Sequence, residues 1–203
     1  MSKPFFSVIV PAHNSEMYLS KCLLSVKRQE FTDYELIVVC DRCTDFTGKI
    51  ANDYADRVII TDHGMDGLAR NAGIDAAKGD WILFLDDDDW WIHEYVLTEL
   101  HKAAQILPET VNMLCFDFIW KGRGYAVNVP DRMNIAVWSK AFRRDLIGET
   151  RFPAIQFTSD KDFMDEIIKK RPVCYALNQL MYYYNFMRRG SQTEQHARED
   201  EGK

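Results

Sequence analysis

Four adjacent carboxylates, Asp86-Asp87-Asp88-Asp89, directly follow the apolar segment Trp81–Leu85. Adjacent carboxylates repel one another unless a positive charge lies among them. A hard divalent cation with oxygen ligands, Mn²⁺ or Mg²⁺, would relieve that repulsion and would bring diphosphate oxygens with it. A solvated acidic loop is the alternative. The apolar segment before the run and Trp90-Trp91 after it argue against this alternative, because four carboxylates without a binding role are unfavourable between apolar segments. The run therefore predicts a metal site that handles a diphosphate.

Short apolar runs alternate with helical patterns through the first half of the chain, which is typical of a parallel sheet with crossover helices. We expect strands over Phe6–Val10, Tyr34–Val39, Arg57–Thr61 and Trp81–Leu85. We expect helices over the apolar stripe that runs from Met17 to Val26, and over Thr44–Ala55, Gly67–Ala77 and Ile92–Leu107. In an open α/β sheet the ligand lies at the carboxyl ends of the strands, where the aspartate run falls.

Two further strand ends carry side chains that would open on the same crevice. The first expected strand ends in Pro11-Ala12-His13-Asn14, and the second ends in Cys40-Asp41-Arg42-Cys43-Thr44-Asp45. An acidic side chain there could accept a hydrogen bond from the imide or the ribose hydroxyl of a nucleotide. A helix cap is the alternative role, and Thr44 or Asp45 would suit it.

The second half of the chain is less regular. We expect a strand over Val111–Phe118, an irregular hairpin or loop over Gly122–Val129, a helix over Phe163–Lys170 and a short strand over Val173–Leu177. Residues 194–203 are polar and charged, which predicts a disordered, solvated tail. A chain of 203 residues suits one compact domain, and we place its end at residue 193.

Composition narrows the class of protein. The net charge of −6 argues against a nucleic-acid binder, which would need a basic stripe to meet phosphates. The five cysteines are odd in number, so no disulfide scaffold is expected, and we interpret Cys40 and Cys43 as two free thiols beside a strand end. No apolar stretch has the length of a membrane span, which predicts a cytoplasmic protein with at most peripheral membrane contact.

Four segments in register give the chain a family resemblance. They are Ser7–Asn14, Asp41–Asp45, Gly67–Gly73 and Phe84–Asp89. Together they resemble the family 2 glycosyltransferases, the large inverting GT-A family that elaborates bacterial polysaccharides. The resemblance implies an α/β GT-A fold: a Rossmann-like, mostly parallel central sheet with helices on both faces and an irregular C-terminal, acceptor-side part. It also implies one domain over residues 1–193, with a nucleotide-sugar-binding half at 1–110 and an acceptor-side half at 111–193.

The resemblance also implies roles in donor binding. Asp41 falls where the family's acidic residue recognises the nucleobase, typically uracil, and Pro11, Ala12 and His13 would line the base pocket. Arg70 matches an arginine near the nucleotide. Asp86 and Asp88 are the outer members of the family's Asp-x-Asp motif. Asp88 would bind the metal directly, Asp86 would reach the metal, the ribose or the sugar, and Asp87 would support nucleotide-sugar binding.

The second half extends the resemblance. Val137–Arg144 is similar to a segment that precedes the acceptor site, and Ser159–Phe163 resembles the acidic pair and aromatic that carry the catalytic base. By register Asp160 takes that role, with a helix N-cap as its alternative role. Such a base removes the acceptor hydroxyl proton while the metal stabilises the leaving diphosphate, and a single displacement inverts the anomeric centre.

The last motif, Tyr182–Ser191, is similar to the family's tyrosine-rich strand and the loop that follows it. Its tyrosines are interpreted as core packing. Arg188 or Arg189 would close over the diphosphate, because guanidinium groups match phosphate oxygens.

The resemblance therefore implies an enzyme that moves one sugar from a nucleotide-sugar, expected to be a UDP-sugar, to a glycan, lipid-linked or protein acceptor in bacterial-type polysaccharide or glycoconjugate synthesis. Cys40, Arg42 and Cys43 depart from the usual acid and small residues after the second strand. That departure keeps open a non-catalytic module that only binds a nucleotide-sugar. A nucleotidyltransferase would need a glycine-rich basic loop after the first strand, and a dehalogenase-type phosphatase would carry Asp-x-Asp on its first strand.

Overall fold

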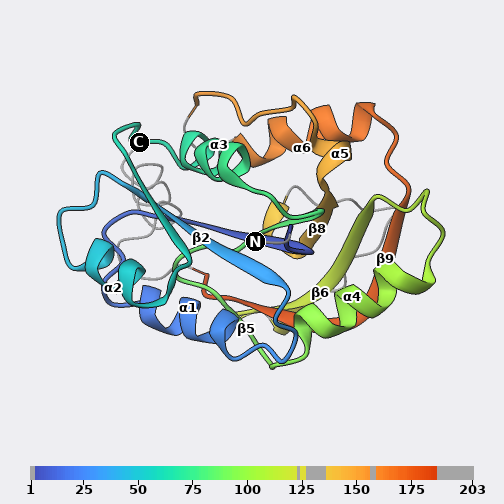
Figure 1. The fold of residues 1–203 in the computed structure, drawn as a ribbon, viewed down its shortest axis with the longest axis horizontal. Helices are drawn as coiled ribbons and strands as arrows, with labels where there is room; N and C mark the ends of the chain where they lie inside the picture. The colour runs from blue at the N-terminus through green and yellow to red at the C-terminus, as the bar shows by residue number, and fades with distance from the viewer. Residues whose placement is uncertain (1–2, 123, 127–135, 156–158, 187–203) are drawn as a thin grey trace.

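The structure is a computed structural model that describes residues 3–122, 124–126, 136–155 and 159–186. One sheet contains every strand of these residues, in the order β3-β2-β1-β4-β8-β6-β9-β5, with β7 paired to β6 (Figure 1). The strands are β1 (Phe6–Ala12), β2 (Tyr34–Asp41), β3 (Arg57–Thr61), β4 (Trp81–Phe84), β5 (Trp90–Trp91), β6 (Met113–Trp120), β7 (Gly124–Ala126), β8 (Lys140–Arg143) and β9 (Cys174–Tyr184).

Six of the nine strands in the described residues, β1, β2, β3, β4, β6 and β9, point in the same direction. β1 pairs in parallel with β2 and β4, and β2 pairs in parallel with β3. β8 is antiparallel to both β4 and β6, so β6 points the same way as β4, and β9 is again parallel to β6. The expected α/β fold with a mostly parallel central sheet is confirmed.

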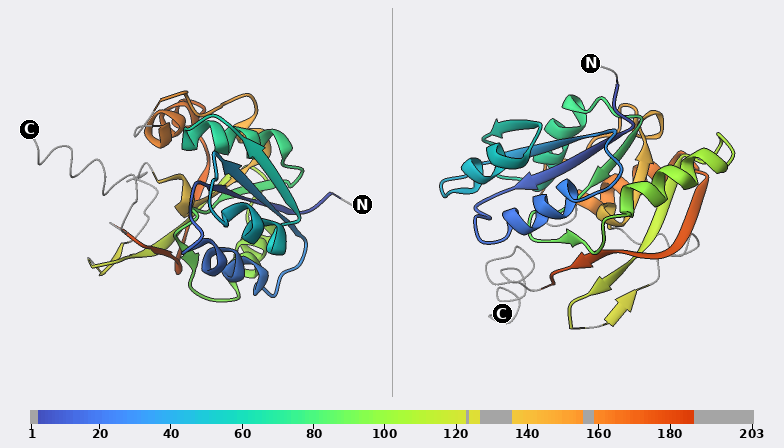
Figure 2. Two further views of the ribbon diagram at one scale, coloured as in Figure 1. Left: turned by 90° about the vertical axis from the view of Figure 1, so that its left-hand side faces the viewer. Right: turned by 60° about the horizontal axis from the view of Figure 1, so that its bottom comes forward.

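Helices cover both faces of the sheet, as expected (Figures 1 and 2). The first face carries α1 (Leu19–Lys27), α2 (Thr47–Tyr54) and α4 (Val96–Ile106), and the second carries α3 (Asp66–Ala76), α5 (Arg144–Ile147) and α6 (Ser159–Lys169). Side chains of a strand point alternately to its two faces. Val8 and Val10 of β1 accordingly join the core on the first face, and Ile9 joins the core on the second.

The close packing of α3 on β1 depends on one glycine. A Cβ atom added to Gly73 would lie 2.3 Å from Cγ2 of Ile9, which is too close for two carbon atoms. The helix that begins beside the strand ends can therefore lie directly against the sheet. This contact fixes the position of Arg70, which lies one turn earlier on α3.

Most elements differ from their expected bounds by a few residues, and the largest differences are in α4, α6 and β9. α6 begins at Ser159 and not at Phe163. The helix expected from Ile92 begins only at Val96, because the buried side chain of Gln29 holds this segment: its Oε1 accepts from Leu97 N at 3.0 Å and its Nε2 donates to His93 O at 2.8 Å. The strand expected to end at Leu177 continues to Tyr184, because it pairs along the full length of β6. Met17 is 80% exposed and lies before α1, so its assignment to the apolar stripe was wrong.

Some predictions fall wholly or partly outside the described residues. Arg188, Arg189 and the tail at 194–203 lie outside them, as does half of the loop expected over 122–129. The end of the domain at residue 193 therefore stays a prediction. In the described part of the chain no helix is long and apolar enough to cross a membrane, and the cytoplasmic location stays a prediction as well.

The tight contact at Gly73 gives a prediction for stability. We expect Gly73→Ala to lower the free energy of unfolding by about 1–3 kcal/mol, because the added methyl group forces α3 away from Ile9. Gly48→Ala in α2 is the matched control: nothing lies within 4 Å of its added Cβ, and the change should raise stability by about 0.5–1 kcal/mol. Urea unfolding followed by circular dichroism measures both values. Equal effects of the two substitutions would contradict the packing argument.

Candidate functional site

The aspartate run lies at the carboxyl end of β4, beside the end of β1. Leu85 N donates to Ile9 O at 3.0 Å, so the chain stays paired with β1 until the run begins. Asp89 N then donates to Asp86 O at 3.1 Å and closes the run into a turn. Within this turn the side chains of Asp86, Asp87 and Asp89 make different contacts.

Asp89 anchors the turn to the end of β9. Its carboxylate is fully buried and accepts hydrogen bonds from Tyr182 Oη at 2.6 Å and from Asn185 N at 2.7 Å. Tyr182 Oη also accepts a bond from Asp86 N at 3.3 Å, and Asn185 Nδ2 donates to Asp88 O at 3.3 Å. Burial raises the pKa of Asp89 well above its usual value, with the neighbouring carboxylates Asp88 and Asp86 adding to the effect. Asp89 is therefore an internal support of the turn.

Asp87 joins the turn to the end of β1. His13 N donates to Asp87 Oδ2 at 3.1 Å. The ring of His13 lies 2.7 Å through Nδ1 from the carbonyl oxygen of Asp41, so Nδ1 carries a proton and donates. Pro11 and Ala12 are buried just before it. The predicted base-pocket residues and Asp87 therefore lie together at the ends of β1 and β2.

Arg70 joins the aspartate turn to the second half of the chain. Its guanidinium donates through Nη2 to Asp86 Oδ1 at 2.7 Å, and its Nη1 lies 3.4 Å from Asp160 Oδ1. The Arg70 side chain is 6% exposed, whereas both carboxylates are 24% exposed. The structure thus brings together a predicted nucleotide residue, a predicted metal or sugar residue and the predicted base.

The charge of Arg70 is balanced by three acids. Burial alone would lower the pKa of Arg70, but the carboxylates of Asp160, Asp86 and Asp66 raise it above its usual value. Its guanidinium carbon also lies 5.6 Å from the ring centre of Phe152, which packs on the same side chain. Arg70 therefore stays charged at every physiological pH.

Asp160 has the electrostatic environment of a base that works near neutral pH. Burial raises the pKa of Asp160 to about 6; Arg70 opposes this rise, and the carboxylates of Asp86 and Asp66 add to it. Asp160 is the second residue of α6, so it lies within the first helical turn and not at the N-cap position that its alternative role would require. A carboxylate with a pKa near the working pH combines a large ionised fraction with good proton affinity.

Asp41 is more engaged within the protein than the sequence implied. Its two oxygens accept four hydrogen bonds, from Thr61 Oγ1 at 2.9 Å and from the backbone N–H groups of residues 63, 64 and 65 at 2.6, 2.6 and 3.1 Å. Burial alone would raise the pKa of Asp41, but these donors lower it. In this arrangement Asp41 holds the loop after β3 against the end of β2.

The loop between β2 and α2 is held by side-chain to backbone hydrogen bonds. Asp45 Oδ1 accepts from Thr47 N, the first residue of α2, at 2.9 Å. The N-cap position itself is Phe46, so neither Thr44 nor Asp45 is the cap residue that was expected. Asn14 Oδ1 accepts from Thr44 N at 2.8 Å and ties this loop to the end of β1. Cys40 and Cys43 are free thiols, as expected.

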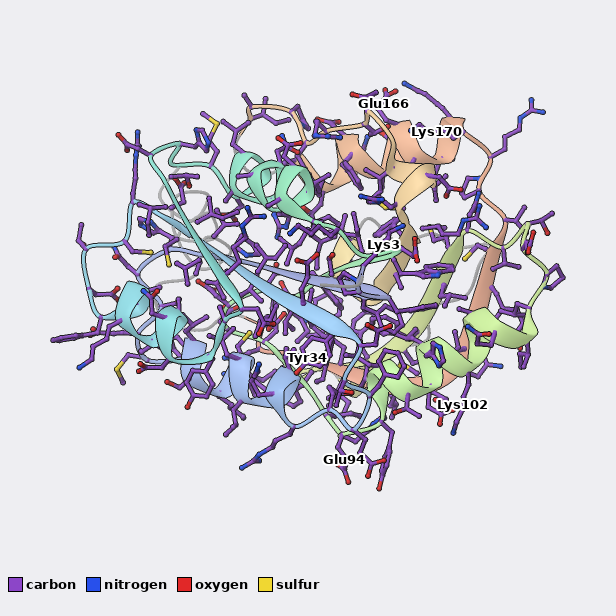
Figure 3. The ribbon with its side chains drawn as sticks, viewed as in Figure 1. Lys3, Tyr34, Glu94, Lys102, Glu166 and Lys170 are labelled. Atoms are coloured by element: carbon purple, nitrogen blue, oxygen red, sulfur yellow. The ribbon has the colours of Figure 1, made fainter. Side chains whose placement is uncertain are left out.

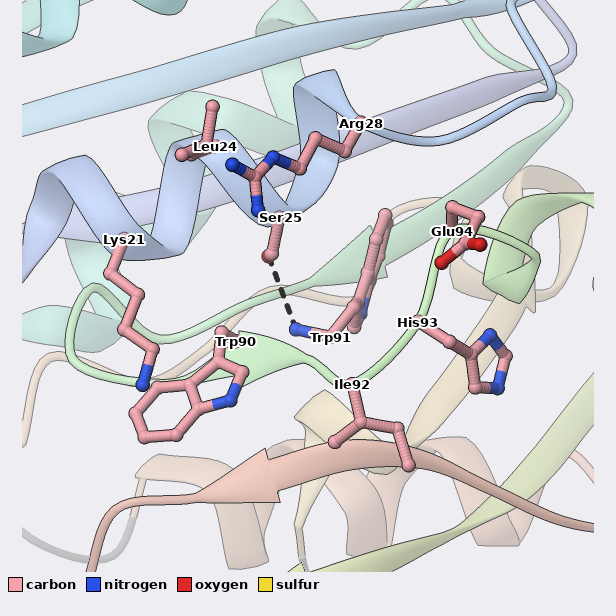
Figure 4. Close-up of a pocket in the computed structure, with 9 residues that line it drawn as sticks. All are labelled: Lys21, Leu24, Ser25, Arg28, Trp90, Trp91, Ile92, His93 and Glu94. Carbon is pink, nitrogen blue, oxygen red and sulfur yellow. Dashed lines mark hydrogen bonds between the residues drawn. The ribbon is translucent and has the colours of Figure 1, made fainter.

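A separate hollow of about 530 Å³ lies between α1 and the β5 segment (Figure 4). The ammonium of Lys21 lies 3.0 Å above the ring centre of Trp90, and the ring of Tyr183 stacks on Trp90 at 4.2 Å. The Lys21 ammonium and the Tyr183 ring cannot occupy the same face of Trp90, so they cover its two faces. A ligand therefore cannot stack on this ring in the present arrangement. The carboxylate and arginine groups described above do not line this hollow.

Comparison with known proteins decides the family. A family profile described as "Glycosyl transferase family 2" matches residues 7–164. The chain belongs to glycosyltransferase family 2. This assignment agrees with the four segments that carry the resemblance, and it leaves no support for a nucleotidyltransferase or a phosphatase.

Named relatives give the same assignment. The chain is similar to glycosyltransferase GlyA of Streptococcus pneumoniae, with 27% identity over 91% of this chain and 31% of that protein. It is also similar to a PGL/p-HBAD biosynthesis glycosyltransferase of Mycobacterium tuberculosis, with 34% identity over 73% of this chain and 62% of that protein. The chain therefore spans less than two thirds of the length of either relative.

Solved structures share the fold of this family 2 chain. S. aureus TarS 1–349 in complex with UDP-GlcNAc is similar with a TM-score of 0.82 and 25% identity, over 93% of this chain and 60% of that one. Glucosyl-3-phosphoglycerate synthase from Mycobacterium tuberculosis, solved with Mn²⁺ and UDP, has a TM-score of 0.71 and 18% identity, over 96% of this chain and 75% of that one. The expected GT-A fold is confirmed.

The carboxylates at the end of β4 suit a metal ion that takes part of its ligands from a bound molecule. Within the described residues, no group of three or more His, Cys, Asp or Glu side chains converges as a metal site. Asp89 is taken by Tyr182 and the Asn185 N–H, and Asp86 is shared with Arg70. Mg²⁺ commonly takes only one or two carboxylates and completes its shell with water and substrate phosphates. The donor set of Asp86 and Asp88 fits such a site.

Three supporting residues were missed by the sequence analysis. Tyr182 is fully buried, as the core-packing interpretation required, but its hydroxyl also binds Asp89. Asn185 binds the same turn, and Asp66 adds a carboxylate beside Arg70. Tyr182 and Asn185 lie within the tyrosine-rich motif, which was the available signal. Asp66 lies next to the glycine that opens an expected segment and carried no signal of its own.

The contact of Tyr182 with the aspartate turn gives a second prediction. We expect Tyr182→Phe to lower the free energy of unfolding by about 1–3 kcal/mol, because buried Asp89 loses one of its two donors. Tyr183→Phe is the matched control, since Tyr183 contacts Trp90 through its ring, which the change retains. Chemical unfolding measures both variants. Similar small losses in the two variants would show that the hydroxyl of Tyr182 does not support the turn.

Proposed function

We propose that this chain is an inverting glycosyltransferase that moves one sugar from a UDP-sugar to an acceptor hydroxyl. The observation that carries the proposal is the position of Arg70 between Asp86 and Asp160. That contact sets a carboxylate with a raised pKa beside the aspartates that follow β4. A base and a diphosphate-handling group at one place are what a direct glycosyl transfer requires.

The reaction follows from the roles of these side chains. Asp160 accepts the proton of the acceptor hydroxyl while that oxygen forms a bond to the anomeric carbon of the sugar. The bond from that carbon to the diphosphate oxygen breaks on the opposite face, so a single displacement inverts the centre. Asp88 and Asp86 would hold Mn²⁺ or Mg²⁺, which when bound supplies positive charge to the leaving diphosphate. Arg70 keeps Asp86 and Asp160 in register.

The nucleotide end of the donor would lie at the ends of β1 and β2. Pro11, Ala12 and His13 would line the pocket of the base, and Asp41 would accept its imide N–H. Because four donors already fill the oxygens of Asp41, binding of a base requires one of the N–H groups at 63–65 to give way. Likeness to the UDP-GlcNAc complex of TarS supports a UDP-sugar as donor. Arg188 is proposed to close over the diphosphate.

The acceptor is proposed to be a glycan, a lipid-linked glycan or a protein, in synthesis of a bacterial-type polysaccharide or glycoconjugate. The names of the relatives support this class, since one of them is a PGL/p-HBAD biosynthesis glycosyltransferase. A non-catalytic nucleotide-sugar-binding module is the second candidate, favoured by the departures at Cys40, Arg42 and Cys43. Turnover of a UDP-sugar by the purified protein separates the two.

The metal site is tested by donor binding. We expect Asp88→Ala to weaken Mn²⁺-dependent binding of UDP-GlcNAc at least about tenfold, because the metal loses a direct ligand. Isothermal titration calorimetry with Mn²⁺ and with EDTA measures this effect. Asp53→Ala, at an exposed carboxylate on α2, is the control for the loss of one negative charge. Unchanged affinity of the Asp88 variant would exclude Asp88 as a metal ligand.

The base is tested by kinetics. We expect Asp160→Asn to lower kcat by about 10²–10⁴-fold, because the amide cannot accept the proton of the acceptor. Donor affinity should stay nearly unchanged. In the wild type, kcat/KM should rise with pH through about 6, because Asp160 acts only when ionised and burial raises the pKa of Asp160 to about 6.

Asp162→Asn is the matched control for this substitution. Asp162 is the second acid of the same motif and lies two positions further along α6, so its side chain points to another side of the helix. It should keep its activity and the same pH profile. Full transfer activity of Asp160→Asn would remove Asp160 from the role of base.

A further inference from the structure

Lys140 is a fully buried lysine at the start of β8 that none of the proposed steps uses. Its register partner on β6 is Cys115, and the two lie opposite each other across the antiparallel pair. An ammonium group removed from water is stable only with close polar partners. Lys140 Nζ donates to Ala136 O at 2.7 Å and lies 3.3 Å from Ser139 Oγ.

The carbonyl that Lys140 binds belongs to a particular peptide group. The C=O of Ala136 and the N–H of Val137 are the two ends of one planar peptide unit. The N–H of Val137 donates a hydrogen bond to the carboxylate of Asp160. The ammonium and the carboxylate therefore hold opposite ends of the same peptide. Hydrogen bonds in such a chain polarise and strengthen one another.

We infer that Lys140 is a positioning residue: it fixes and polarises the 136–137 peptide, whose N–H holds the carboxylate of Asp160 toward the acceptor. This inference rests on the proposed role of Asp160 as the base. It explains why a lysine is buried in the sheet directly under the helix that carries Asp160. β8 lies beneath α5 and α6 in Figure 1.

Both groups are charged in the pH range that the reaction needs. Burial lowers the pKa of Lys140 to about 8, against the opposing influence of Cys115, Cys174 and Asp160, so the amine is mainly protonated at neutral pH. Asp160 faces Arg70 and Asp66 from α3 and Asp86 from the turn after β4. Loss of Lys140 removes a positive charge and weakens the N–H donor, and both changes disfavour the ionised form of Asp160.

The test measures the pKa of Asp160 directly by ¹³C NMR titration of aspartate carboxyl groups in the free protein. We expect Lys140→Met to raise the pKa of Asp160 by about one pH unit. Val137→Pro removes the N–H donor itself and should raise it too. Val137 is the first residue of the 3₁₀ turn η2 (Val137–Ser139), and Ala136 has φ −68° and ψ 110°, a conformation that suits the residue before a proline. In the double variant the two shifts should not add, because they act through one peptide.

The matched control is Lys170→Met. Lys170 at the end of α6 also binds backbone carbonyls, those of Leu146 and Ile147 at 2.8 and 2.7 Å, and it lies on the outer side of the molecule (Figure 3). Its loss should leave the pKa of Asp160 unchanged. An unmoved pKa in Lys140→Met or in Val137→Pro, or shifts that add fully in the double variant, would overturn the inference.

Transfer kinetics separate this inference from the proposed function. In Lys140→Met and in Val137→Pro, the rise of kcat/KM with pH should move to higher pH. The shift should equal the change in the pKa of Asp160 measured by NMR, and the affinity for UDP should stay the same. If the wild type transfers no sugar but the NMR shifts occur, the proposed function fails and the peptide link stands. The wild type could instead transfer sugar with a kcat/KM that rises through about pH 6, as proposed. If the variants then leave both this pH dependence and the pKa of Asp160 unchanged, the positioning role of Lys140 fails and the proposed function stands.

Discussion

The site depends on one buried ion pair network, in which the guanidinium of Arg70 holds Asp86 on one side and Asp160 on the other. These three residues come from α3, from the turn after β4 and from α6, so their contact joins the two halves of the chain. Removal of Arg70 from this network would leave the carboxylates of Asp86, Asp160 and Asp66 without their shared positive charge, which is strongly destabilising. The packing of α3 on β1 at Gly73 and the contact with Phe152 set where the guanidinium can lie.

The aspartate turn is fixed from the opposite side by β9. A strand that ended at Leu177 would leave Tyr182 and Asn185 without a defined position, and both are needed to bind the turn. The long parallel pairing with β6 supplies that position. The four adjacent acids thus have distinct roles. Asp89 supports the turn, Asp87 contacts the end of β1 and Asp86 binds Arg70. Asp88 is the proposed metal ligand.

Local patterns predicted much of this arrangement. The strands around Val8, Leu36 and Leu83 could be found because buried parallel strands are continuous apolar runs. The position of their carboxyl ends then predicted where the ligand site lies. The length of β9 could not be found, because its burial does not alternate along the strand and its extent depends on its pairing with β6. The four donors to Asp41 were equally hidden, since three are backbone N–H groups, which every sequence contains. The pattern of side chains in the sequence thus predicts which residues are buried, but it does not predict which backbone N–H groups bind a given side chain.

The charges of the site also bear on the proposed binding of a metal ion and a nucleotide-sugar donor. Arg70 and Lys140 provide two positive charges, whereas Asp66, Asp86, Asp87, Asp88 and Asp160 lie in or beside the same region. Burial also raises the pKa of Asp89 well above its usual value. A diphosphate is itself strongly negative, so its approach to such a site is unfavourable unless a cation comes with it. Binding of the donor and of the divalent ion should therefore be mutually dependent, and the excess of carboxylates is the physical reason.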